Sequence, residues 1–161
     1  MVKKEGVSKV FSHVDKRFIF GFKLLVAGYW NCSVFIPVDF SFHRENKDKK
    51  RNKYGLNKKQ HKQQKRTKRE KGLPVVKRFK ELNMKKTDTV VAMFKRIRQR
   101  KIAVDYILID SWFTSVSLIN RLLKVDKNVH IIGMYKYNSK LSIEGKEYSI
   151  KQLRKRKGKM S

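Results

Sequence analysis

The sequence predicts an α/β protein in which helices pack on a mixed sheet. Three observations lead to this fold class. Within residues 17–42, two segments alternate apolar and polar side chains with a period of two, which is typical of strands. Segments 85–101 and 115–123 carry apolar residues at helical spacing. Nearly continuous apolar runs at 104–110 and 129–134 are typical of parallel strands that helices cover on both sides.

The first two predicted strands span residues 17–30 and 34–42. Each places its apolar side chains on one side: Phe18, Phe20, Phe22, Leu24 and Val26 in the first, and Val34, Ile36, Val38, Phe40 and Phe42 in the second. The intervening YWNCS favours a hairpin, so we expect the strands to be antiparallel. Because Pro37 has no amide proton, its strand should lie at an edge or contain a bulge there.

Residues 44–71 form a strongly basic segment. They contain 14 Lys and Arg against 3 Asp and Glu, which gives 14 − 3 = +11, and almost no apolar residues. Such a segment cannot bury enough surface to fold by itself, and we expect a mobile insertion over 44–72. It is either a solvated spacer or a phosphate-binding arm. In the second case the candidate DNA-binding residues are Lys49, Lys50, Arg51, Lys53, Lys58, Lys59, Lys65, Arg66, Lys68 and Arg69.

The chain beyond the insertion predicts alternating helices and strands. Thr87 or Thr89 is expected to cap the first helix, and Ser115 the second. Residues 141–150 predict a hairpin that turns at Glu144-Gly145. A capping box of Ser149 and Gln152 then begins a basic terminal helix.

Charge and cysteine content restrict the function classes. Lys and Arg number 42 against 13 Asp and Glu, a formal charge of +29, which favours an anionic partner and above all nucleic acid. We expect no membrane partner, because no apolar run approaches the roughly 20 residues of a membrane span, and no secretory signal is visible. Cys32 is the single cysteine and the four histidines are scattered, so neither a disulfide nor a zinc site is expected. A cytoplasmic location follows.

Asp110 is the main candidate for chemistry. It follows the apolar run 104–109, and ligands of α/β sheets gather at the carboxyl ends of the strands. A carboxylate at this place is a suitable Mg²⁺ ligand. Alternatively, Asp110 only caps the following helix or ends the strand in a solvated turn.

Two longer segments carry a family resemblance. KVFSHVDKRFIFGFKLLVAGYWNCSVFIPVDFSF and KKTDTVVAMFKRIRQRKIAVDYILIDSWFTS resemble the DDE transposases of bacterial insertion sequences, of the insertion sequence four type. The likeness covers residues 9–43 and 85–137, with 138–161 as the start of a β-rich insertion and a basic tail. It implies a ribonuclease H-like domain in which three acids hold two Mg²⁺ ions that cleave DNA and transfer strands. By its place in the motif, Asp110 would be the second acid, a catalytic metal ligand.

The chain departs from the family at the other two acids. No aspartate precedes Asp15, and the third acid, a glutamate on a later helix, has no match, so only one of three ligands is found. Asp15, Asp39, Glu144 and Glu147 are expected to have structural or solvated roles. We therefore expect a truncated, decayed or split transposase that binds DNA but does not cleave it alone, with weak or no Mg²⁺ binding.

The resemblance also implies partners and a location. The partners would be transposon-end DNA and a second copy or a complementary transposase fragment, in the bacterial cytoplasm at the nucleoid. Trp112 and Phe113 can stack on DNA bases, although packing within the fold is the favoured interpretation. The competing hypothesis is a non-enzymatic polybasic protein that binds nucleic acid.

Overall fold

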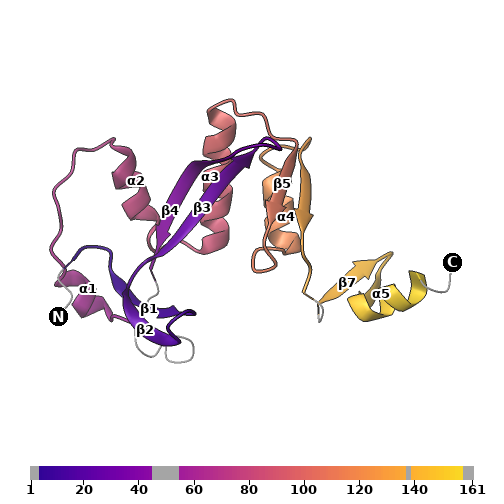
Figure 1. Ribbon diagram of the computed structural model, residues 1–161, viewed down its shortest axis with the longest axis horizontal. Coiled ribbons are helices and arrows are strands. Elements are labelled where there is room, and N and C mark those ends of the chain that lie inside the picture. The colour runs from indigo at the N-terminus through magenta and orange to yellow at the C-terminus, as the bar shows by residue number, and fades with distance from the viewer. Residues whose placement is uncertain (1–3, 45–54, 137–138, 158–161) are drawn as a thin grey trace. The chain divides into compact units, whose positions relative to one another are not determined.

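The computed structural model describes residues 4–44, 55–136 and 139–157 (Figure 1). The chain divides into two compact units, Met1–Lys101 and Ile102–Ser161. Helices and strands occur in both units, which confirms the general α/β class. The described strands pair as four two-stranded sheets, not as one continuous mixed sheet.

Two antiparallel hairpins begin the first unit. Strands β1 (Ser8–Ser12) and β2 (Arg17–Gly21) form one, and β3 (Lys23–Trp30) and β4 (Phe35–His43) form the other. The prediction of one strand over 17–30 is therefore wrong. The strand divides at Phe22 because the chain changes partner there: Gly21 pairs with Ser8, whereas Lys23 pairs with His43.

The β3–β4 hairpin has the predicted antiparallel pairing and the predicted bulge. Ala27 faces Asp39 but Gly28 faces Pro37, so Val38 is an additional residue on β4. Such a bulge accommodates a residue that cannot donate to the ladder. The side-chain carbonyl of Asn31 accepts the amides of Ser33 and Val34 and so closes the connection between the strands.

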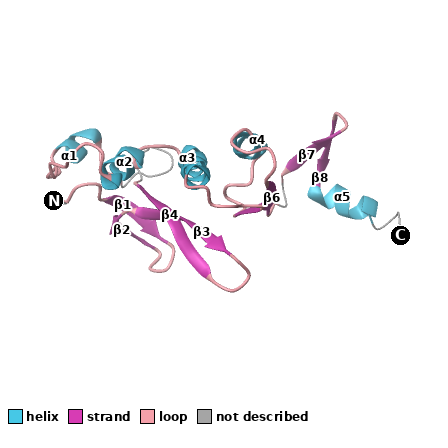
Figure 2. Ribbon diagram, turned by 90° about the horizontal axis from the view of Figure 1, so that it is seen from above, coloured by secondary structure: helices cyan, strands magenta, loops and turns pink. Residues whose placement is uncertain are grey.

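The described part of the first unit also has three helices: α1 (Lys58–Lys62), α2 (Pro74–Glu81) and α3 (Lys86–Gln99). Helices α2 and α3 contact β4 and lie on the same side of its hairpin (Figure 2). The prediction that Thr87 or Thr89 caps α3 is wrong. Lys85 is the N-cap and makes no side-chain cap bond, and the Thr89 hydroxyl donates to the carbonyl of Lys85. The buried apolar residues around α3 are Leu82, Val91, Met93, Phe94 and Ile97.

The apolar side of the first hairpins is open. The side chains that alternate along these strands, among them Phe20, Phe22, Leu24, Val26 and Phe40, are exposed, and no described segment covers them. The opposite side of β4, with Asp39 and Ser41, is the buried one. Sequence alternation thus identified the two sides correctly, but the helices pack on the more polar of them.

A parallel β-α-β arrangement begins the second unit. Strand β5 (Tyr106–Ile109) pairs in parallel with β6 (His130–Gly133), and α4 (Val116–Leu123) connects them. Leu118, Leu122 and Val129 are buried. The expectation that both faces of β5 are covered is wrong, since Leu108 is 75% exposed. The single helix between these strands packs on one face and leaves the other open among the described residues.

The last elements match their predictions. Strands β7 (Lys140–Ile143) and β8 (Lys146–Ser149) form a hairpin, and α5 (Ile150–Lys157) follows. Glu144 and Gly145 both have positive φ, 51° and 77°, the conformation that a two-residue hairpin turn requires. The capping box is present, with Ser149 and Gln152 each accepting the backbone amide of the other. Within the described residues, no helix is long and apolar enough to cross a membrane.

Candidate functional site

Asp110 follows β5 directly, at the carboxyl end of the parallel pair. Its side chain is exposed, and the Ser111 hydroxyl donates to Oδ1 at 3.1 Å. Its carbonyl accepts the amides of Phe113 at 2.8 Å and Thr114 at 3.1 Å, and also the Thr114 hydroxyl at 3.1 Å. The strand and this bonded turn fix the backbone, so the carboxylate projects from a defined position into solvent.

The next residues differ in burial although they share one turn. Phe113 is partly buried, whereas Trp112 is 77% exposed. The interpretation that Trp112 packs within the fold is therefore wrong. The Lys136 ammonium lies 5.1 Å from the centre of the Trp112 ring, within the range of a cation–π contact. Lys136 follows β6, whose carboxyl end lies at the same edge as that of β5.

A two-ion metal site requires several oxygen ligands around a shared position. Asp110 contributes one carboxylate, and its nearest recorded side-chain partner is the hydroxyl of Ser111. Within the described ranges 4–44, 55–136 and 139–157, no group of three or more His, Cys, Asp or Glu side chains is placed to hold a metal ion. The described residues alone thus do not fit a two-ion centre, and we derive no catalytic step through one.

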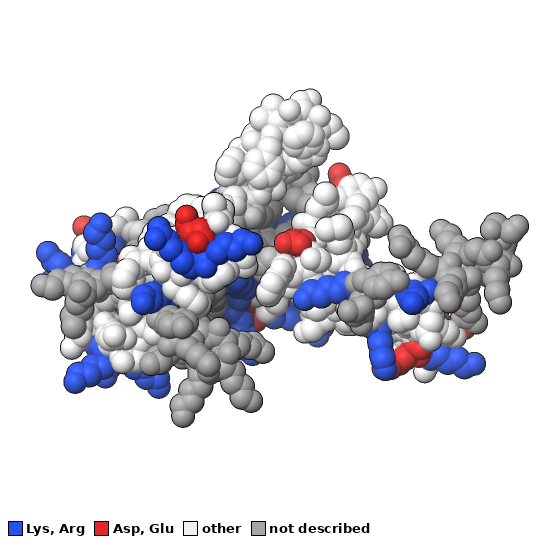
Figure 3. Space-filling model, turned by 60° about the horizontal axis from the view of Figure 1, so that its bottom comes forward, with Lys and Arg blue, Asp and Glu red and all other residues white. Residues whose placement is uncertain are grey.

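The basic segment supplies the predicted DNA-binding residues, of which Lys49, Lys50, Arg51 and Lys53 lie outside the described residues. In the part that is described, the side chains of Lys58, Lys59, Lys65, Arg66 and Lys68 are exposed. Figure 3 shows that Lys and Arg outnumber Asp and Glu on the face it draws. The structure records no ion pair for these five side chains among the described residues, and all five are accessible to an anionic partner.

The described part of the basic segment is anchored, contrary to the expectation of an unstructured insertion. The Asn57–Gln60 capping box begins α1. Gln64 is buried and donates to the carbonyl of Val7 at 2.6 Å. Arg69 pairs with Glu5 at 2.8 Å and lies over the Phe79 ring at 4.1 Å, so this predicted DNA contact has a structural role. Polar contacts to the N-terminal residues thus hold a segment that lacks an apolar core of its own.

Two further groups near the basic segment have altered acidity. Burial lowers the pKa of His61, and the neighbouring charge of Arg44 lowers it further. Burial also lowers the pKa of Arg44, with a contribution from the positive charge of Arg66. Arg44 is held by Asn83, whose side-chain oxygen accepts from Nε at 2.7 Å. Burial first, and the neighbouring positive charge second, therefore favour the neutral form of His61.

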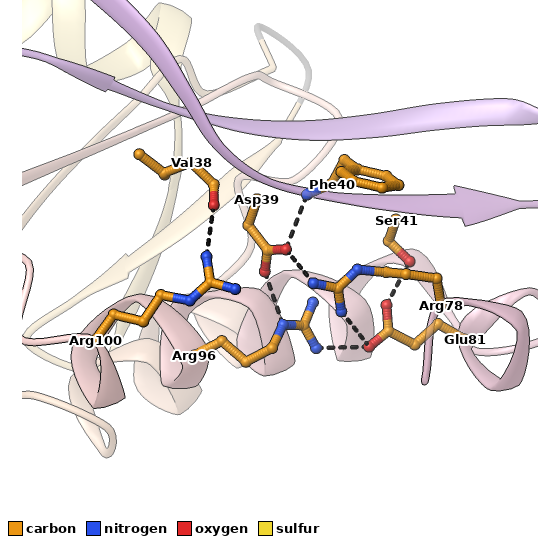
Figure 4. Close-up of polar contacts among 8 residues, drawn as sticks. All are labelled: Val38, Asp39, Phe40, Ser41, Arg78, Glu81, Arg96 and Arg100. Carbon is orange, nitrogen blue, oxygen red and sulfur yellow. Dashed lines mark hydrogen bonds and ion pairs between the residues drawn. The ribbon is translucent and has the colours of Figure 1, made fainter. Parts of the chain in front are cut away.

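A buried ion-pair network connects β4, α2 and α3 (Figure 4). Asp39 accepts from Arg78 Nη2 at 2.5 Å and from Arg96 Nε at 2.7 Å. Glu81 accepts from Arg96 Nη1 at 2.6 Å and from the Ser41 hydroxyl at 2.6 Å. Two carboxylates thus face two guanidinium groups, and the charges of the network cancel.

This network gives Asp39 a structural role, as the sequence analysis expects, but sequence reasoning missed its partners. The available signals were weak. Asp39 and Ser41 are polar residues on a strand whose other side is apolar. Arg78 and Glu81 are three residues apart in a short segment after Pro74. Helix α2 was not predicted at all, although proline at the first helical position is a common start signal. Arg100 adds a further bond, donating to the Val38 carbonyl at 2.9 Å.

Comparison with known protein families, with curated proteins and with solved structures finds no match for this chain.

Proposed function

We propose that this chain is part of a DDE transposase of the insertion sequence four type, that Asp110 is the second of its three acids, and that it binds DNA. The observation that carries the proposal is the exposed Asp110 carboxylate at the carboxyl end of a parallel β-α-β unit. Ligands of open α/β sheets gather outside the carboxyl ends of the strands, which is where this carboxylate lies. One alternative, that Asp110 caps α4, is not supported, because Ser115 has that role. The other alternative, that Asp110 ends the strand in a solvated turn, agrees with its exposed side chain and is separated from a catalytic role by the Asp110→Ala test below.

The proposed fold is ribonuclease H-like. The β3–β4 hairpin, helix α3 and the parallel β5-α4-β6 unit occur in the order that this proposal needs, with α1 and α2 as additional helices between β4 and α3. In a complete enzyme of this family, Asp110 would be one of three acids that hold Mg²⁺, and the metal would supply the chemistry of phosphodiester cleavage. This chain's own contribution would be to hold the Asp110 carboxylate on a rigid strand and turn.

The DNA partner is supported by charge. A formal charge of +29 and the exposed cations from Lys58 to Lys68 match the phosphate backbone. A second copy of the chain, or a segment carrying the other two acids, is the proposed protein partner. A DNA-bound protein of this kind would reside at the bacterial nucleoid.

The test supplies the missing acids. The purified chain is mixed with separate segments of an insertion sequence four transposase that carry its first and third acids, and nicking of labelled transposon-end DNA is measured with Mg²⁺ or Mn²⁺. We expect activity only in the mixture, and its loss in Asp110→Ala. The matched control is Asp105→Ala, which removes an exposed carboxylate just before the amino end of the same strand. Activity that survives Asp110→Ala contradicts the proposal.

The same charge also favours a second candidate, a non-enzymatic polybasic protein that binds nucleic acid. It predicts DNA binding without any dependence on Asp110 and no gain of nicking from added segments. The two candidates agree that binding weakens with salt, with a slope of about −0.9 in log affinity against log salt for each duplex phosphate contacted. Salt dependence alone does not separate them, whereas the Asp110 comparison does.

The role of the basic segment has its own test. One variant changes Lys58, Lys59, Lys65, Arg66 and Lys68 to glutamine, and its control changes the exposed Lys77, Lys95, Lys124, Lys127 and Lys146. Both lower the formal charge by the same amount, 29 − 5 = +24. If the segment contacts the DNA backbone, the slope of log affinity against log salt becomes less steep by about 0.9 for each phosphate contact that the first variant loses. The control variant should keep most of the original slope. Equal losses would show that the charge acts diffusely.

A further inference from the structure

The turn after β5 presents Trp112 from a rigid base. It begins with Asp110, whose carbonyl accepts the amides of both Phe113 and Thr114, and it ends at Ser115, which caps α4 through the amide of Leu118. Trp112 is the third residue of this bonded turn. The backbone that carries the indole is therefore fixed on both sides, and little order would be lost when a ligand contacts it.

Exposure of a single aromatic residue does not by itself assign a function. The second observation is Lys136, whose ammonium lies 5.1 Å from the centre of the exposed ring. Since β5 and β6 are parallel, the segments that follow them meet at one edge, which places this cation from a distant part of the sequence beside the indole. An exposed aromatic ring and an ammonium over it are thus combined at the edge that carries Asp110.

This combination fits a nucleotide whose base is unpaired. The base can stack on the indole, and its phosphate can contact the ammonium. Bases inside an intact duplex cover each other's faces and cannot stack in this way. We infer that Trp112 and Lys136 form a stacking site for an unpaired base of single-stranded DNA. The inference rests on the proposed DNA-binding function and assigns it a specific contact.

Charge at the site adds a distinguishing property. One cation, Lys136, is recorded against the Trp112 ring, so the site offers fewer phosphate contacts than the basic segment. Its contribution comes mainly from stacking, which is less sensitive to salt than the contacts of the basic segment. Trp112 should therefore change the affinity for single strands without changing the salt slope.

The tryptophan content allows a direct measurement, because Trp30 and Trp112 are the two tryptophans of the chain. In the Trp30→Phe variant, fluorescence excited at the red edge of tryptophan absorption reports Trp112 alone. We expect a single-stranded thymidine oligonucleotide to quench it, and a blunt duplex of equal length to leave it nearly unchanged. The matched control is Trp112→Phe, in which the exposed Trp30 should show no quenching.

Affinity gives a second readout, the fluorescence anisotropy of the labelled oligonucleotide. Trp112→Ala should weaken single-strand binding about 5- to 150-fold, the range for loss of one stacked base, and affect duplex binding little. Trp112→Phe should retain most of the affinity because an aromatic face remains. Lys136→Gln should cause a smaller loss than Trp112→Ala.

The outcomes separate this inference from the proposed function. Binding by anisotropy without quenching of Trp112 overturns the stacking site and leaves DNA binding intact. Absence of any DNA binding overturns both. Trp112 fluorescence that changes with protein concentration in the absence of DNA would show that the indole packs against another protein surface, and it also overturns the inference.

Discussion

Replacing Asp39 with asparagine is expected to destabilise the first unit by about 3–5 kcal/mol, the usual cost of breaking a buried ion pair. The Asp39 side chain is 1% exposed and accepts one guanidinium bond from each of Arg78 and Arg96. Hydrogen bonds to charged groups contribute about 1.5–3 kcal/mol each, so two of them give a loss of the same size. Asparagine keeps an acceptor oxygen but not the charge, which leaves Arg78, 7% exposed, with Glu81 as its remaining recorded acidic partner.

Urea unfolding followed by circular dichroism measures this loss. With a slope of about 2 kcal/mol per molar urea, the midpoint should fall by about 1.5–2.5 M. The control is Asp15→Asn, which removes an exposed carboxylate that accepts from the Ser12 hydroxyl, and it should cost less than about 0.5 kcal/mol. If the Asp39 variant is unfolded without urea, both proteins are compared in trimethylamine oxide, which stabilises folded states.

A double-mutant cycle separates the ion pair from other effects of the substitution. Adding Arg78→Met to Asp39→Asn removes the guanidinium charge that has lost its partner. The stability loss of the double variant should therefore be smaller than the sum of the losses of the two single variants by about 1.5 kcal/mol or more. A loss below about 1 kcal/mol for Asp39→Asn, or additive losses in the cycle, would refute the argument that this network holds the helices on β4.

The other predictions concern three local features. The pKa of His61 in the folded chain lies below its ordinary value of 6.5, so the unfolded chain takes up the proton first as the pH falls, and stability should decrease below about pH 6.5. Urea midpoints measured between about pH 7 and 5 test this. The same decrease in the His61→Gln variant would contradict it. Ser115→Ala removes the cap of α4 and should cost about 1 kcal/mol in urea unfolding, whereas no loss would show that the cap is idle. In Gly133→Ala the new methyl group would lie 2.6 Å from the Thr114 hydroxyl, so we expect the turn at Asp110 to shift and amide exchange at Thr114 to rise; unchanged exchange would refute the contact.

Local patterns were the predictable part of the fold. The hairpin at Glu144-Gly145, the Ser115 cap and the β3–β4 pairing depend on neighbouring residues and appear as expected. The bulge at Pro37 follows from the missing amide proton of proline. The division of residues 17–30 at Phe22 was not predictable in the same way, because it depends on which distant strand each half pairs with.

For the candidate site, the sequence predicted the place of Asp110 but not its surroundings. The apolar run before it indicates a strand end, and the structure has one there. Nothing in the local pattern indicates that Lys136 lies beside Trp112, since that contact follows from the parallel pairing of β5 and β6. The anchoring of Gln64 and Arg69 at Val7 and Glu5 likewise joins segments about 60 residues apart.

The sequence by itself determined the charge, the Ser115 cap, the Ser149–Gln152 capping box, the turn at Glu144-Gly145 and the two-sided alternation of the strands, because these properties depend on side chains within a few residues of each other. Only the tertiary structure decided which side of each strand is buried. Asp39 and Ser41 face the helices because Arg78, Glu81 and Arg96 neutralise and bond them there. A buried charge is tolerated only where its partners converge in space, and no rule of sequence spacing brings together residues from a strand and two helices.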